Sequence, residues 1–211
     1  NMTEQRNNES LLSGYRALEL ADEKGVYCGK LLADLGADVI KVEPPRGDKT
    51  RYRGPFYHDE VDRGKSLYFL HFNTNKRSVT LDIEHEAGQA IFRELVKTAD
   101  ALIETCPPGH LKRLRLCYED LKEINPKLVM CSITPFGQSG PHRHFKGTDL
   151  VNMAVGFLSQ LAGEPDRAPL RWGGEQSYHC ASQYAATGIM YALYHRLATG
   201  EGQYIDVSIQ E

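Results

Sequence analysis

The sequence has no long hydrophobic run and no excess of basic charge. No apolar stretch approaches the roughly 20 residues that a membrane-spanning helix needs. Lysine and arginine number 25 against 28 acidic residues, which gives a net charge of −3 at pH 7. Because nucleic acids and anionic membranes attract basic patches, this balance argues against both kinds of partner. Residues 1–10 are polar and unlike a secretory signal peptide, so we expect a cytoplasmic protein.

Cysteine is scarce and scattered. The five cysteines are odd in number and contain no C-x-x-C pair, which suggests neither a zinc site nor a disulfide framework. A reducing compartment fits this usage. The closest histidine pair, His142 and His144, has no acidic or cysteine partner at metal-ligand spacing. We therefore expect surface histidines and no metal site.

A dinucleotide-binding fingerprint is also missing. The first strand, helix and strand are predicted at residues 15–20, 27–35 and 38–43, with Gly36 ending the helix. This order favours a parallel sheet with right-handed crossovers. The turn at residues 21–26 reads ADEKGV and has no Gly-x-Gly-x-x-Gly, which disfavours NAD or FAD as a ligand.

Strands and helices continue to alternate along the chain. Further strands are expected at residues 79–82, 101–104, 128–133 and 204–209, and further helices at 86–98, 118–124 and 149–161. In the helix at 86–98, the side chains expected to point inward are Ala90, Ile91, Phe92 and Leu95. The pattern predicts an α/β fold, with a Rossmann-like, open, mostly parallel sheet and helices on both faces. We assign residues 15–211 to this domain and residues 1–14 to a flexible lead-in.

The longest predicted helix runs from Ser177 to about Leu197 without a proline. Its residues are apolar on nearly every face, so we expect it to be buried nearly all round. Gly200 is expected to end it, because glycine suits a left-handed C-terminal position. At residues 174–178, backbone N–H groups and the helix dipole favour an anion. Chemistry is therefore expected at the start of this helix.

Two loops are candidates for ligand contacts. The loop at residues 105–109 follows a predicted strand and so lies at the carboxyl edge of the sheet, where open α/β folds bind ligands. The loop at residues 46–65 has arginines that either are solvated or face a phosphorylated ligand. They are Arg46, Arg51, Arg53 and Arg63.

Seven short motifs occur in order over most of the chain. They are LGADVIKVEPP at 35–45, NKRSVTLD at 75–82, ADALIE at 99–104, PG at 108–109, NPKLV at 125–129, FGQSGP at 136–141 and TGEGQ at 199–203. Each is weak alone, but together they resemble the class III (CaiB/BaiF-type) CoA-transferases. The resemblance implies the N-terminal portion of that family's large Rossmann-like domain, since family members are longer. It also implies a homodimer or heterodimer, which is interlocked in full-length members.

The resemblance implies that CoA moves between an acyl-CoA and a carboxylic acid through a carboxylate-linked intermediate. The CoA thioester is then a substrate, and no tightly bound cofactor is expected. The family's nucleophile is an aspartate at the start of the long helix, and at family spacing this position falls on Tyr178. A one-residue gap gives Ser177. A tyrosine cannot replace the aspartate, because its phenol titrates at about pH 10 and cannot form an acyl-CoA thioester.

Three interpretations follow from that replacement. Glu175 could supply the carboxylate instead, or could be a capping or surface glutamate. The chain could be the noncatalytic CoA-binding subunit of a heteromeric transferase, or a truncated homologue without autonomous activity. The fold could also bind CoA thioesters for other chemistry. Racemisation is unsupported because the racemase histidine position holds Thr148, and Asp149 beside it is expected to N-cap the next helix.

The resemblance also implies residues that contact CoA. Arginine offers paired donors to phosphate, so Arg113 would meet the CoA phosphates, with a solvated helix-face charge as the alternative. The other implied contacts are Glu23 and Lys24 near the nucleotide end, Leu81 and Asp82 beside the adenine, Thr105, Cys106 and Pro107 in the family's Asn-Phe-Gly loop, and Lys146 near the pantetheine.

Overall fold

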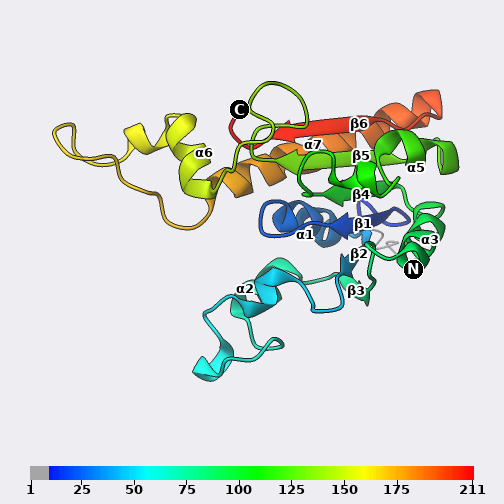
Figure 1. Cartoon of the computed structure of the whole chain (residues 1–211), viewed down its shortest axis with the longest axis horizontal. Helices are drawn as coiled ribbons and strands as arrows, with labels where there is room; N and C mark the ends of the chain where they lie inside the picture. The colour runs from blue at the N-terminus through cyan, green and yellow to red at the C-terminus, as the bar shows by residue number, and fades with distance from the viewer. Residues whose placement is uncertain (1–9) are drawn as a thin grey trace, which may run out of the picture.

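The computed structural model describes residues 10–211, and the part of the predicted lead-in at residues 1–9 lies outside the described residues. Residues 10–14 form a turn, in which the Leu12 amide donates to the Leu35 carbonyl at 2.9 Å. Six parallel strands form one sheet in the order β3-β2-β1-β4-β5-β6 (Figure 1). The strands are β1 (Arg16–Leu20), β2 (Asp38–Glu43), β3 (Arg77–Thr80), β4 (Ala101–Glu104), β5 (Val129–Thr134) and β6 (Tyr204–Ser208). The predicted α/β fold with a parallel sheet is confirmed.

Helices cover both faces of the sheet, which explains why the central strands are apolar on both sides. On one face, α1 (Val26–Asp34) and α7 (Gln176–Thr199) pack on a core that includes Ile103. On the other, α3 (Glu86–Val96), α4 (His110–Arg113) and α5 (Tyr118–Ile124) pack on a core that includes Leu102. Since successive strand residues point to opposite faces, these two neighbours in β4 serve different cores.

Two segments extend away from the sheet, and both begin at its carboxyl edge (Figure 1). The first, which we call the excursion, covers residues 44–76 between β2 and β3. It contains η1 (Lys49–Tyr52), η2 (Tyr57–Asp59) and α2 (Leu67–Phe72). The second lies between β5 and α7 and contains α6 (Asp149–Val155) and η3 (Leu158–Leu161).

The longest helix, α7, forms as predicted, but the prediction that it is buried nearly all round is wrong. It ends at Gly200, whose φ of +77° is the left-handed conformation expected there. Ala185 and Ile189 are fully buried toward the sheet. The opposite face is solvent-exposed. Its large side chains lie three or seven positions apart, so they share the side of the helix that points away from the sheet. These are Tyr184, Tyr191 and Tyr194, which are 75%, 72% and 77% exposed.

The predicted inward face of α3 is partly wrong. Phe92 is fully buried as expected, but Ala90 and Ile91 are exposed. The helix presents Gly88, Phe92 and Val96 to the sheet, a spacing of four residues that rotates its neighbours outward.

The predicted helix at residues 149–161 is interrupted. It stops at Gly156, because Phe157 has a φ of +61° that no α-helix accommodates, and resumes as η3. The expected N-cap is also wrong. The Thr148 hydroxyl, not Asp149, caps α6 by accepting from the Val151 amide at 3.4 Å.

Candidate active site

Two cavities at the carboxyl edge of the sheet share Lys49 as a lining residue. The first, which we call the strand-edge cavity, has a volume of about 380 Å³ and lies beyond the ends of β1, β2 and β4. In this strand order the crossovers reverse direction between β1 and β4, which is where open α/β sheets bind ligands. The cavity brings together five of the implied CoA contacts. They are Leu81, Asp82, Thr105, Cys106 and Pro107.

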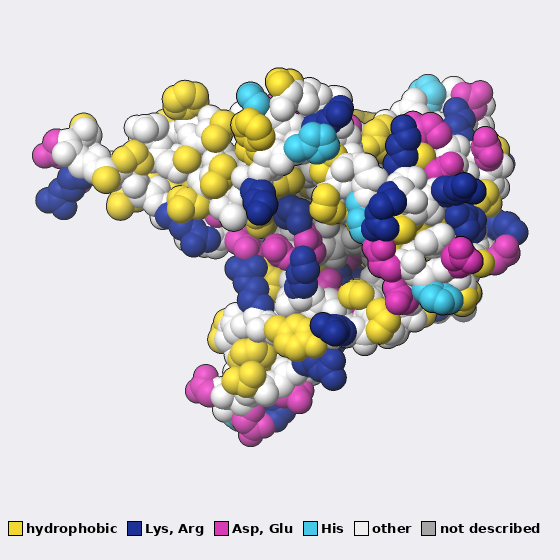
Figure 2. All heavy atoms as spheres, in the orientation of Figure 1, with side chains coloured by type: hydrophobic (Ala, Val, Ile, Leu, Met, Phe, Trp, Pro, Cys, Tyr) yellow, Lys and Arg dark blue, Asp and Glu magenta, His cyan; other side chains and the backbone are white. Residues whose placement is uncertain are grey.

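The second cavity, which we call the helix-start cavity, has a volume of about 570 Å³ and opens beside the first turn of α7. Figure 2 shows charged side chains of both signs gathered where the excursion meets the rest of the molecule. Three carboxylates, three cations and Tyr178 line the cavity. The carboxylates are Glu23, Asp149 and Glu175, and the cations are Lys49, Arg53 and Arg171.

Glu175 is held by two side chains of the excursion. Its Oε1 lies 2.7 Å from Arg53 Nη1, and its Oε2 accepts a hydrogen bond of 2.6 Å from the Tyr68 phenol. Burial and this hydrogen bond raise the pKa of Tyr68, so the phenol keeps its proton and remains a donor. Glu175 occupies the N-cap position of α7, but its side chain makes no capping bond, and at 8% exposed it is not a surface glutamate.

Asp149 links the starts of α6 and α7. Its Oδ1 accepts from the Ser177 amide at 3.1 Å and from the Ser177 hydroxyl at 2.8 Å. Its Oδ2 is buried with no hydrogen-bond partner among the described residues, and Arg171 Nη2 lies 3.6 Å away. The carboxylate is thus buried, with the Arg171 guanidinium beside it.

Glu23 stands in the turn between β1 and α1 and lines the helix-start cavity, not the strand-edge cavity. Its side chain is half-buried and forms no hydrogen bond or ion pair with any residue that the structure describes. Tyr178, at the position where the resemblance implies a nucleophile, is 6% exposed. Burial, then the charges of Glu23 and Glu175, raise the pKa of Tyr178 to about 12. That position therefore holds a neutral phenol at physiological pH.

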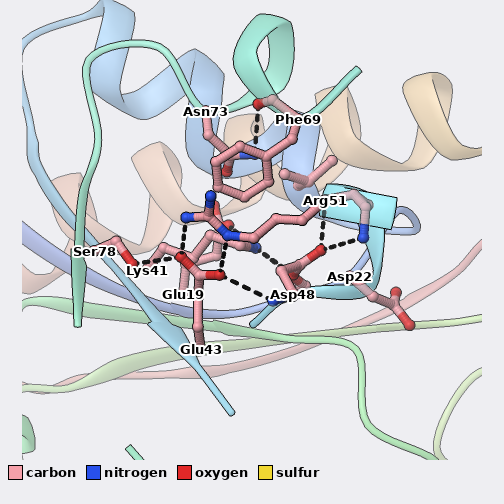
Figure 3. Close-up of polar contacts among 12 residues, drawn as sticks. Glu19, Asp22, Lys41, Glu43, Asp48, Arg51, Phe69, Asn73 and Ser78 are labelled. Carbon is pink, nitrogen blue, oxygen red and sulfur yellow. Dashed lines mark hydrogen bonds and ion pairs between the residues drawn. The ribbon is translucent and has the colours of Figure 1, made fainter. Parts of the chain in front are cut away.

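A network of buried charged side chains, which includes Asp48, holds the loop just before Lys49 in place (Figure 3). Lys41 is 1% exposed, and its Nζ lies 2.9 Å from Glu19 Oε1 and 2.8 Å from Asp48 Oδ2. Burial would lower the pKa of Lys41, but the charges of Glu19 and Asp48 outweigh it and raise the pKa. A Cβ at Gly29 would lie 1.7 Å from Glu19 Oε2, so only glycine lets α1 approach the network this closely.

A second ion pair anchors the same loop. Arg51 donates to both oxygens of Glu43, at 2.6 and 2.7 Å, and its guanidinium lies 3.7 Å from the centroid of the Phe69 ring. Burial would raise the pKa of Glu43, but hydrogen bonds from Arg51 and Ser78 lower it to about 2. Of the arginines in this loop, Arg51 and Arg53 are therefore each paired with a carboxylate of the chain itself.

The remaining implied CoA contacts lie around the cavities. Lys24 Nζ is 2.5 Å from Asp22 Oδ2. Arg113 is 61% exposed and donates to Glu84, which lines the strand-edge cavity, at 2.9 Å. Lys146 is exposed in the loop between β5 and α6 and lines neither cavity.

Sequence reasoning missed Tyr68 and Lys49. Tyr68 and Glu175 are separated by 107 positions, and no local pattern connects them. Within residues 10–211 there is no group of three or more histidine, cysteine or acidic side chains arranged to hold a metal ion. The helices of this same part of the chain include none that is both long and apolar enough to span a membrane.

Comparison with known proteins shows which family the chain matches. The family model for CoA-transferase family III matches residues 12–211. The succinyl-CoA:(R)-benzylsuccinate CoA-transferase subunit BbsE of Thauera aromatica is 42% identical over 94% of this chain and 48% of its own length. Succinate–glutarate CoA-transferase of Agrobacterium fabrum is 41% identical over 99% of this chain and 53% of its own length.

A solved structure shares the fold. The crystal structure of a CaiB/BaiF family protein from Brucella suis matches with a TM-score of 0.90 and 41% identity, over 96% of this chain and 54% of that one. The chain thus spans about half the length of the relatives it matches.

Proposed function

This chain belongs to CoA-transferase family III, and we propose that it moves CoA between an acyl-CoA and a carboxylic acid through a carboxylate-linked intermediate. The CoA thioester is a substrate of this reaction, and the proposal includes no tightly bound cofactor. The carboxylates that can carry the intermediate are the three that line the helix-start cavity, Glu23, Asp149 and Glu175. A carboxylate suits this role because it is ionised at neutral pH and its anhydride and thioester are activated acyl carriers.

The observation that supports the proposal is that the two cavities share a lining residue. Lys49 borders both the strand-edge cavity, lined by five implied CoA contacts, and the helix-start cavity, lined by three carboxylates. A CoA thioester bound in the first can extend its thioester toward carboxylates in the second. In this arrangement Arg113 lies at the rim of the first cavity, within reach of the CoA phosphates.

The proposal includes a second protein chain and a cytoplasmic location. The exposed aromatic face of α7, with Tyr184, Tyr191 and Tyr194, supports association, since aromatic residues are enriched at the centres of protein interfaces. The partner is another copy of the chain or a different transferase subunit. All five cysteines are free, which supports a reducing compartment.

The alternative is a CoA-binding subunit that has no catalysis of its own. Two points support it: the resemblance implies that Tyr178 occupies the family's nucleophile position, and Glu175 is fully paired with Arg53 and Tyr68. One relative, BbsE, is itself named as a subunit.

Transfer of CoA from succinyl-CoA to glutarate distinguishes the transferase from the noncatalytic subunit. The chain is incubated with succinyl-CoA and glutarate, and the CoA esters are resolved by mass spectrometry. CoA binding is checked by the rise in melting temperature, which NAD and ATP should not reproduce. Formation of glutaryl-CoA supports the transferase, whereas binding of CoA without any glutaryl-CoA supports the noncatalytic subunit. No thermal shift with CoA would contradict both.

A further inference from the structure

We propose that Glu23, in the turn between β1 and α1, is the carboxylate that carries the intermediate. This inference rests on the proposed transferase function and identifies its nucleophile. It follows from comparing the three carboxylates of the helix-start cavity, because a nucleophile needs an ionised oxygen with a free lone pair that faces the substrate. The three are Glu23, Asp149 and Glu175.

Glu175 has both oxygens occupied. Oε1 is paired with Arg53 and Oε2 accepts the Tyr68 phenol, at 2.7 and 2.6 Å. An attack by either oxygen would first break a short, charge-assisted contact in a nearly buried setting, and such contacts are the stronger kind. The geometry assigns Glu175 to holding the excursion against α7.

The carboxylate of Asp149 is buried and lies next to a cation. One oxygen is fixed by the amide and hydroxyl of Ser177, and the other is buried beneath Arg171. Because that oxygen is buried, an acyl-CoA could reach it only after neighbouring atoms had moved. This carboxylate joins two helices and does not face the cavity with an accessible oxygen.

Glu23 has neither restriction. Its side chain is half-buried in the cavity lining, and no residue that the structure describes pairs with it. Glu23 is in the same turn as Asp22, which lines the strand-edge cavity. Its carboxylate therefore lies near the strand-edge cavity, from which the thioester of a bound acyl-CoA would extend into the helix-start cavity. Its charge is the largest electrostatic influence on the phenol of Tyr178, ahead of that of Glu175. Glu23 is thus close to the position that holds the nucleophile in the family.

The reaction balances with Glu23 as the carrier. A Glu23 oxygen attacks the acyl-CoA carbonyl, the C–S bond breaks, and CoA leaves as a thiolate from a Glu23–acyl anhydride. The thiolate attacks the Glu23 carbonyl carbon, which releases the first acid as a carboxylate and leaves a Glu23–CoA thioester. The acceptor carboxylate then attacks this thioester, and the released thiolate attacks the new acyl carbonyl. Glu23 is regenerated without net proton transfer.

Mapping the trapped residue tests this assignment. The unmodified chain is incubated with succinyl-CoA and hydroxylamine, which converts a glutamyl thioester or anhydride into a hydroxamate, and the modified peptide is located by mass spectrometry. We expect the hydroxamate on Glu23 and on no other residue. In a parallel reaction the control variant Glu123→Gln, at an exposed position of α5 outside both cavities, should still yield the Glu23 hydroxamate.

The outcomes separate this inference from the function on which it rests. A hydroxamate on Glu175 or Asp149 would overturn the inference and leave the transferase function intact. CoA binding with no hydroxamate on any residue would contradict both. The variant Glu23→Gln should reduce formation of glutaryl-CoA by about 10³-fold or more, in keeping with the loss of a nucleophile. Glu23→Gln with wild-type transfer would overturn the inference.

Discussion

The Tyr68 phenol donates a hydrogen bond of 2.6 Å to Glu175, although the two residues are 107 positions apart. Tyr68 belongs to α2 in the excursion, and Glu175 immediately precedes α7. Arg53 pairs with the other oxygen of Glu175, and its guanidinium lies 4.3 Å from the centroid of the Tyr68 ring. These three side chains therefore fasten the excursion to the start of the longest helix.

Removing the Tyr68 hydroxyl should weaken that attachment. Tyr68→Phe is expected to lower the free energy of unfolding by about 1–3 kcal/mol, because a buried carboxylate oxygen loses its partner. Urea denaturation measures the change. Tyr57→Phe is the matched control, since Tyr57 belongs to the same excursion and is 54% exposed. Equal unfolding free energies for the two variants would contradict the structural role of the Tyr68–Glu175 bond.

The buried ammonium of Lys41 should be essential for stability. Lys41→Met leaves the Asp48 carboxylate without its cation and Glu19 paired with Lys76 alone, and breaking a buried ion pair in this way typically costs about 3–5 kcal/mol. Lys97→Met is the control, because Lys97 is 52% exposed and pairs with Glu94 on the surface. That change should stay within about 0.5 kcal/mol of wild type. Similar denaturation midpoints for the two variants would rule out the proposed importance of the network.

Glu104 should make stability depend on pH. Burial raises its pKa from 4.5 to about 7, against hydrogen bonds from Ser132 and the Cys106 amide that lower it. Between these values the folded protein holds a proton that the unfolded chain has released. The contribution of Glu104 to stability is therefore fully present below about pH 4.5, falls as the pH rises to about 7, and stays low above that.

Glu104→Gln removes this dependence, since glutamine stays neutral and its carbonyl oxygen can still accept from Cys106. The stability gained over wild type should be on the order of 3 kcal/mol at pH 8 and should vanish toward pH 4.5. Urea denaturation at several pH values measures the difference. Glu123→Gln, at an exposed position of α5, should show a difference that does not change with pH. A pH-independent gain from Glu104→Gln would disprove the protonation of Glu104.

Arg113 should contribute modestly to CoA affinity. Arg113→Met is expected to raise the Kd for CoA by about threefold to tenfold, roughly 1 kcal/mol, because the guanidinium is exposed and already shared with Glu84. The effect should shrink at high ionic strength, as for other exposed charges. Titration calorimetry with CoA measures it. Arg167→Met, in the exposed segment before α7, is the control, and equal Kd values for both variants would remove Arg113 from the site.

Much of the fold could be predicted because its signals are local. The runs of apolar residues in β1, β2, β4 and β5 and the glycines that end α1 and α7 specify a parallel α/β sheet. The wrong predictions concern which face of a helix is buried. Tyr184, Tyr191 and Tyr194 are apolar enough to suggest burial, but no second layer covers them in the described structure. Which face of an apolar helix packs depends on its tertiary neighbours, which a periodic pattern does not identify.

The site was only partly predictable for the same reason. The structure brings Leu81 and Thr105, two of the CoA contacts that the resemblance implies, to one cavity, because their loops follow strands whose ends meet at one edge. Whether the oxygens of Glu175 or Glu23 have hydrogen-bond partners depends on residues far away in the sequence, such as Tyr68 for Glu175. A sequence shows which residues are carboxylates, whereas only the assembled cavity shows which oxygens are occupied.

Isotope exchange reports directly on a carboxylate-linked transfer of CoA. The chain is incubated with succinyl-CoA and isotope-labelled succinate, without any other acid, and the label in succinyl-CoA is followed by mass spectrometry. We expect label to enter succinyl-CoA in the wild type and in the control variant Glu123→Gln, and to fail to enter in Glu23→Gln. Tight binding of CoA with no exchange in the wild-type chain would contradict this expectation.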